Sequence, residues 1–136
     1  MIKSFGYACG AAAGIVLGLG TPSVRAQDAS GGAPVNCISL MRIDHTQVVD
    51  DKTILFFMKD RRVYKNAMQN ACPGLRENKP FMYRVMLNQL CNVDTVTVLE
   101  DWGFGYAPGA TCLLEKFEPI SDEEAAELIA NADEKK

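Results

Sequence analysis

Four cysteines constrain the fold of this chain more than any other feature of its sequence. They stand at Cys37, Cys72, Cys91 and Cys112, and the nearest two are nineteen residues apart. Structural zinc sites and thioredoxin-type redox centres usually hold their cysteines in closely spaced C-x-x-C pairs. Because that spacing is missing and the chain has a single histidine, the pattern favours two structural disulfides over a zinc site or a reactive dithiol.

The first 26 residues predict a compartment in which such disulfides form. They combine Lys3, an apolar run of about a dozen residues and small residues before a cleavage point after Ala26, which is typical of a secretory signal peptide. The run is shorter than the roughly 18 apolar residues of a membrane-spanning helix. A lipid-modified N-terminus at Cys9 is the rival reading, but almost no apolar segment precedes it. We therefore expect export to the periplasm or the extracellular space, with no transmembrane segment in the mature chain.

Three pairings of the four cysteines are possible, and residue spacing alone does not choose among them. We favour Cys37 with Cys112 and Cys72 with Cys91, since this nested pattern ties the first predicted strand to the last. In the chain-entropy model the two loops contribute about 3 and about 4.5 kcal/mol to stability. The cysteines are thus expected to staple a small domain that has a limited core of its own.

Three segments follow the expected signal peptide. Residues 27–36 are rich in Gly, Ser and Pro and predict a disordered linker. Residues 37–132 are expected to form a single disulfide-stapled domain, and residues 133–136 a charged tail. Signal cleavage removes two of the 14 basic residues and none of the 17 acidic ones, which leaves a formal charge of −5. An acidic chain of this kind is not expected to bind nucleic acid.

Most of the predicted domain reads as short β-strands. Apolar and β-branched runs bounded by polar or glycine-rich segments predict strands, here at residues 37–43, 53–58, 63–68, 81–85, 94–99 and 111–117. The polar segment 59–62 predicts a hairpin turn, residues 44–52 a connection with a short extended piece, and residues 86–91 a single helical turn. The glycine-rich segment 100–110 is expected to be a long loop.

One helix has clear sequence signals, and it lies at the C-terminus. Ser121 and Glu124 form a capping box, and Ile120 is placed to act as a hydrophobic staple. A narrow apolar stripe at i, i+3, i+4 and i+7 follows, at Ala125, Leu128, Ile129 and Ala132. We therefore predict an α+β, mostly β fold: an antiparallel sheet of about five or six strands, curled or barrel-like, with one C-terminal helix that closes one face.

Several segments of the chain, taken in order, resemble the domain-of-unknown-function family 6491, which comprises small exported bacterial proteins. The segments are "CISLMRI", "DDKTILFFM", "VYKNAM", "CPGL", "FMYRV", "LCNVDTVTVL" and "PGATCLLEKFEPI". The resemblance covers the chain from about Cys37 to Ile120, and its cysteine positions are its most specific part. It implies export and a cysteine framework, and it implies no activity, cofactor or catalytic residue.

Catalytic candidates in the sequence are few. His45 is the only histidine of the chain, and histidine is the residue type that most often acts as an acid or base near neutral pH. Nearby Ser39 lacks a G-x-S-x-G setting. Two pairs of adjacent acids, at residues 50–51 and 100–101, lie next to predicted turns, where carboxylates are usually solvated. We interpret His45 as a loop residue beside Asp44, and we predict no catalytic, cofactor-binding or metal-binding residue.

The segment after residue 100 carries the best candidate for binding. Trp102, Phe104 and Tyr106 alternate with glycines, so three rings can project from a flexible loop and stack on a sugar or grip a peptide. The alternative is that one or two rings fold back over the end of the sheet. A small basic spot at Lys59, Arg61 and Arg62 is interpreted as a solvated turn.

Two classes of function remain after these exclusions. The first is an exported, non-enzymatic binding or structural module, whose partner is a protein, a peptide or a glycan. The alternative is a small exported enzyme, either a thiol oxidoreductase that uses one of the cysteines or a hydrolase that uses His45. A free cysteine thiol distinguishes the redox enzyme from the module, and loss of activity on substitution of His45 identifies the hydrolase.

Overall fold

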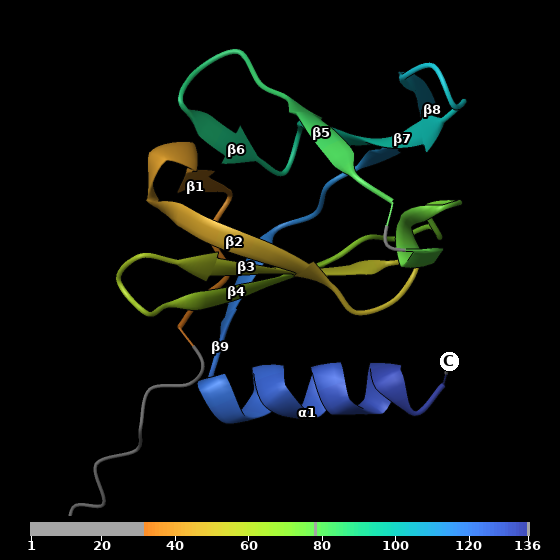
Figure 1. Ribbon diagram of the computed structural model, residues 1–136. Coiled ribbons are helices and arrows are strands. Elements are labelled where there is room, and N and C mark those ends of the chain that lie inside the picture. The colour runs from red at the N-terminus through yellow and green to blue at the C-terminus, as the bar shows by residue number, and fades with distance from the viewer. Residues whose placement is uncertain (1–31, 78, 136) are drawn as a thin grey trace, which may run out of the picture.

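The computed structural model describes residues 32–77 and 79–135 (Figure 1). The expected signal peptide and the first part of the expected linker lie outside these residues. The described chain forms nine strands, two 3₁₀ turns and one α-helix. In chain order they are β1 (Cys37–Ser39), η1 (Leu40–Arg42), β2 (Ile43–Val48), β3 (Thr53–Met58), β4 (Val63–Ala67), η2 (Leu75–Glu77), β5 (Phe81–Arg84), β6 (Gln89–Cys91), β7 (Thr95–Asp101), β8 (Tyr106–Leu113), β9 (Phe117–Ile120) and α1 (Asp122–Asp133).

A four-stranded antiparallel sheet, ordered β2-β3-β4-β9, lies in the middle of the molecule. The predicted hairpin is confirmed: β3 pairs with β4 across the turn at residues 59–62. Arg61 takes a positive φ of 67° in this turn, and the backbone of Met58 bonds to both Arg61 and Arg62. Strand β3 is apolar on both sides because it is central, with Ile54, Leu55 and Phe56 fully buried.

Helix α1 covers one face of this sheet, below it in Figure 1. The predicted N-terminus is confirmed, since the Ser121 side chain accepts a hydrogen bond from Glu124 N at 3.1 Å. Ala125 is 1% exposed and packs with Leu55 and Ile120 of the sheet. The rest of the predicted stripe, Leu128, Ile129 and Ala132, packs against the same cluster. The helix therefore lies on the sheet through the face that its sequence pattern indicates.

The opposite face of the four-stranded sheet meets two smaller sheets, which lie above it in Figure 1. One has three antiparallel strands, ordered β5-β7-β8, and the other pairs β1 with β6. Phe56 and Phe117 from below meet Val96, Val98 and other side chains from above in one core, with the Phe56 and Phe117 rings edge to face at 5.3 Å. The molecule is thus three layers: helix, four-stranded sheet, and the two smaller sheets.

The prediction of a single curled or barrel-like sheet of about five or six strands is therefore wrong. The chain forms three separate sheets of two, four and three strands, and none of them is closed. The physical reason lies in the middle sheet, whose central strand is apolar on both faces. A helix covers only one of these faces, so a second layer of strands packs on the other.

Three local predictions are also corrected. The predicted strand 37–43 is divided into β1 and the start of β2 by η1, where the chain leaves one sheet for another. Residues 86–91 end in strand β6 instead of a helical turn, because Leu90 pairs with Ile38 and is fully buried. The predicted loop 100–110 is mostly strand, since β7 runs to Asp101 and β8 begins at Tyr106.

Pairing also begins before Cys37. Val35, in the expected linker, exchanges two backbone hydrogen bonds of 2.9 Å with Phe117 at the outer edge of β9. At the other end of the domain, α1 runs to Asp133, which is the first residue of the expected tail. The described fold is therefore slightly longer than residues 37–132.

All four cysteines of the described chain form disulfides, but the pairing that we favoured is wrong. The bonds join Cys37 to Cys91 and Cys72 to Cys112. Cys37 and Cys91 lie directly opposite each other in the β1–β6 pair, so their partnership follows from strand register. The second bond ties the loop after β4 to β8. The nested pattern was expected because it joins the first strand to the last, yet β1 pairs with a strand from the middle of the chain.

Candidate functional site

The β7–β8 hairpin ends in a tight, open turn at residues 102–105. Trp102 N donates to Gly105 O at 3.1 Å, and the Asp101 carboxylate accepts from Gly103 N at 2.8 Å. Gly103 and Gly105 have φ values of 78° and 134°, which side-chain-bearing residues rarely adopt. A Cβ added at either glycine would meet no atom within 4 Å beyond its immediate chain neighbours. The glycines are therefore needed for backbone conformation, and the turn projects away from the rest of the protein.

All three aromatic rings of this hairpin are exposed. The exposed fractions are 72% for Trp102, 104% for Phe104 and 62% for Tyr106. The rings therefore do not fold back over the end of the sheet, which was the alternative prediction. Each ring keeps in water an apolar surface that is favourable to bury, at about 25 cal/mol per Å². We call this surface, Trp102 to Tyr106, the aromatic hairpin.

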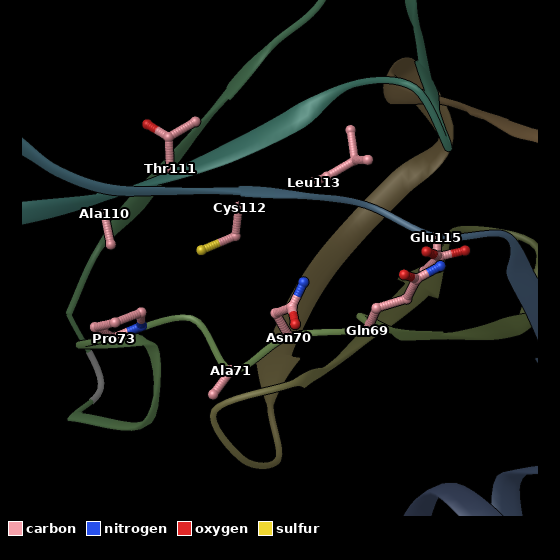
Figure 2. A pocket seen from close by; sticks show the side chains of 9 residues that line it. All are labelled: Gln69, Asn70, Ala71, Pro73, Ala110, Thr111, Cys112, Leu113 and Glu115. Carbon is pink, nitrogen blue, oxygen red and sulfur yellow. The ribbon is translucent and has the colours of Figure 1, made fainter.

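A groove of about 340 Å³ follows the other half of β8 (Figure 2). Its upper wall is the strand itself, and its floor is the segment just before and after Cys72. Figure 2 shows the Cys112 sulfur directed from β8 toward this floor, where it bonds to Cys72. The lining residues are Gln69, Asn70, Ala71, Pro73, Ala110, Thr111, Cys112, Leu113 and Glu115. We call this feature the β8 groove.

A buried asparagine holds one end of the β8 groove in place. Asn66 lies in β4, is 0% exposed, and binds the backbone of Glu115 in both directions. Its Oδ1 accepts from Glu115 N at 3.0 Å and its Nδ2 donates to Glu115 O. The turn between β8 and β9 is therefore fixed to the middle sheet by one side chain. The sequence analysis did not predict a role for Asn66. An amide side chain in a predicted apolar strand could have indicated one, because a buried amide needs hydrogen-bond partners.

His45 lies on strand β2 at the surface, and not in a loop as predicted. Its Nδ1 lies 2.8 Å from the carboxylate of Asp44, and its ring stacks on Phe57 with centroids 4.4 Å apart. Ser39 belongs to a different strand, β1, and no hydrogen bond between Ser39 and His45 is found among the described residues. The histidine therefore has an acidic neighbour but is not joined to a hydroxyl nucleophile.

The adjacent acids that the sequence analysis considered as catalytic candidates form structural contacts. Asp50 accepts from the backbone N of Lys52 at 2.8 Å. The carboxylate of Glu100 bonds to Lys79 at 2.7 Å, and the hydrogen bonds with Glu100 and Glu77 raise the pKa of the Lys79 ammonium. The acid pairs are thus not brought together into one site.

Asp60 pairs with one of the three cations in the basic spot that the sequence indicates. Its carboxylate binds the guanidinium of Arg62 at 2.6 Å and that of Arg42. The hydrogen bond from Arg62 holds the pKa of Asp60 below its ordinary value of 3.8. Lys59 donates to the carbonyl oxygen of Met41 at 2.9 Å. The other two cations of the spot have no acidic partner among the described residues, so the turn keeps a net positive charge.

Neither a metal cluster nor a membrane-spanning helix occurs within residues 32–77 and 79–135. No group of three or more His, Cys, Asp or Glu side chains in these residues is arranged to hold a metal ion. In the same part of the chain, no helix is long and apolar enough to cross a lipid bilayer. The aromatic hairpin and the β8 groove, which share one strand, are the features left to consider.

Comparison with known protein families places this chain in one of them. The model of a family of unknown function, DUF6491, matches residues 3–136. The chain belongs to this family. No curated protein and no solved structure matches it. For this DUF6491 chain the resemblance seen in the sequence is therefore confirmed, and its two disulfides fit a secreted protein.

Proposed function

We propose that this protein is an exported, non-enzymatic binding module and that the aromatic hairpin is its contact surface. The observation that carries the proposal is the exposure of all three rings within the five residues of the aromatic hairpin. A hairpin that served only to connect two strands gains nothing from three large apolar side chains in water. In a complex, by contrast, tryptophan and tyrosine supply much of the binding energy of an interface.

The two disulfides support the other half of the proposal. They join Cys37 to Cys91 and Cys72 to Cys112, and such bonds persist in oxidising compartments outside the cytosol. The apolar, lysine-bearing N-terminus has the features of a signal peptide. With these cysteines paired, no thiol of the described chain is left to act as the nucleophile of an oxidoreductase.

A photoreactive residue in the hairpin tests the binding function directly. We would place p-benzoylphenylalanine at Phe104 of the full-length protein, expressed in a bacterium that exports it, and irradiate the cells. Met41 is a matched control, because it is also a large exposed apolar side chain, at 69%, but lies in η1. We expect a discrete cross-linked product from position 104 and none from position 41. Equal labelling at both positions, or none at 104, would contradict the proposal.

A further inference from the structure

The free edge of β8 in the β8 groove presents unused backbone hydrogen-bonding groups. Leu114 N donates to Asp94 O at 3.0 Å at the end of the β7–β8 ladder. In an antiparallel ladder alternate residues bond to the partner strand, and the residues between them face the other way. Cys112 therefore faces β7, whereas Thr111 and Leu113 direct their N–H and C=O groups to the opposite side. No backbone partner for these groups is found among the described residues.

The other free edges of the molecule are less open to an added strand. Strand β5 has four residues against eight in β8, and the outer edge of β9 is already paired to Val35. The cavity beside β2 is lined by charged side chains, Arg76, Lys79 and Asp133, and such charges discourage strand addition. Among the described residues, β8 is thus the edge that borders a groove almost without charge. Its pairing groups are regularly spaced from Thr111 to Leu113, because the β7–β8 register shifts before this stretch and Pro108 has no N–H.

Glu115 is the one ionisable residue that lines the β8 groove. Its backbone is held by Asn66, but its carboxylate has no hydrogen-bond or ion-pair partner within the described residues. Figure 2 shows the carboxylate at the end of the groove beyond Leu113. An occupant with a cationic side chain at this position would complement the charge. The groove therefore combines strand-pairing groups with a single negative charge at one end.

We propose that the β8 groove binds an extended polypeptide segment of a partner protein, which adds to the β5-β7-β8 sheet as a fourth strand. This inference rests on the proposed function and specifies its partner as a peptide instead of a glycan. Backbone groups of Thr111 and Leu113 pair with the segment, and a lysine or arginine of the segment binds Glu115. About seven residues of strand, roughly 24 Å, reach from Leu113 to the aromatic hairpin, where Tyr106 contacts the far end of the segment.

Linear random dodecapeptides displayed on phage are the probe that tests this proposal. We would select them on the purified exported protein with both disulfides formed, synthesise the recovered sequences and measure their affinity. We expect peptides with a recurrent lysine or arginine, and we expect Glu115→Gln to weaken their binding about tenfold. Glu118→Gln, in β9, is the control for a general change of charge and is expected to leave the affinity unchanged.

Leu113→Pro separates strand pairing from other modes of peptide binding. Proline removes only the edge-facing N–H and is tolerated on edge strands, so we expect folding to be preserved and affinity to fall about tenfold. Leu113→Thr changes the side chain and keeps the N–H, and it should bind within about threefold of the unchanged protein. Hydrogen exchange gives a second readout: the amides of Thr111 and Leu113 should exchange fast alone and slowly with peptide bound.

Each outcome decides the question. Failure to recover peptides, or peptides that bind without protecting Thr111 and Leu113, would overturn the strand-addition proposal. Cross-linking at Phe104 would in that case still support a binding role for the aromatic hairpin. Conversely, strand-paired peptides with no cross-link at Phe104 would support the groove and refute the hairpin as the contact surface.

Discussion

Asn66 links strand β4 to Glu115, which lies between β8 and β9 and belongs to neither strand. It is the only fully buried amide side chain among the described residues, and both of its polar atoms bond to the backbone of Glu115. An unpaired buried polar group costs about 1–3 kcal/mol. The side chain therefore positions the end of the β8 groove. Its removal would leave the backbone N–H and C=O of Glu115 without this partner.

Asn66→Asp is expected to destabilise the protein in a pH-dependent way. A carboxylate accepts from Glu115 N but cannot donate to Glu115 O, and its burial raises its pKa. A raised pKa in the folded state means that stability is retained when the acid is protonated and lost as the pH rises. We expect a loss of about 2–4 kcal/mol at pH 7 that shrinks toward pH 4, relative to the unchanged protein.

Urea unfolding with both disulfides intact measures this loss at each pH. Asn70→Ala is the matched control: Asn70 is exposed on the floor of the groove, and its change should stay within about 0.5 kcal/mol. A loss for Asn66→Asp that is the same at both pH values would show that the proton on position 66 does not govern the contact with Glu115.

At the scale of elements, one carboxylate pairs with an arginine in the β3–β4 turn and with another in η1. Asp60 binds Arg62 within the turn and Arg42 in η1. Both arginines stay charged over the whole accessible pH range. The contact therefore varies with pH only through the protonation of Asp60, whose pKa is lowered in the folded protein by the hydrogen bond from Arg62.

Asp60→Asn should destabilise the protein at neutral pH and have no effect in strong acid. A lowered folded-state pKa contributes stability above the ordinary value of 3.8, and this contribution is lost as the pH falls through the folded-state pKa. The two arginines and the acid are exposed, so the effect is small. Thermal unfolding of both proteins from pH 7 to pH 2 measures it. A difference in stability between the two proteins that grows as the pH falls would contradict a stabilising role for the ionised Asp60 carboxylate.

At the scale of the whole molecule, the two disulfides differ more in access than in the length of chain they close. Their residues are 54 and 40 positions apart, which gives about 4 kcal/mol each in the chain-entropy model. Cys37 is exposed in the short β1–β6 pair, whereas Cys72 is fully buried below β8. A reducing thiolate must reach a sulfur atom to attack it.

We therefore expect Cys37–Cys91 to be reduced before Cys72–Cys112. Protein exported by its own signal should begin at Gln27, have a mass about four daltons below the reduced value, and take no thiol-blocking reagent. After brief treatment with dithiothreitol the reagent should label Cys37 and Cys91 first, as mapped by peptide mass spectrometry. A thiol that is labelled before reduction would contradict the two-disulfide structure, and early labelling of Cys72 would contradict the order.

Local patterns predicted the elements whose signals are contained in a few neighbouring residues. The hairpin at residues 53–67 follows from two apolar runs around a polar turn, and the start of α1 follows from Ser121 and Glu124. The three rings at residues 102–106 were also picked out from their alternation with glycine. Their exposure was left open, because it depends on whether other segments cover the hairpin.

The sequence by itself thus determined the hairpin, the helix with its apolar face, and a framework of four paired cysteines. The tertiary structure alone decided the division into three sheets, the partners of the cysteines and the β8 groove. Cys37 meets Cys91 because β1 pairs with β6, and Glu115 lines the groove because Asn66, 49 residues earlier, holds its backbone. Such contacts join residues that are distant in the chain, so they depend on how the layers pack and leave no local pattern.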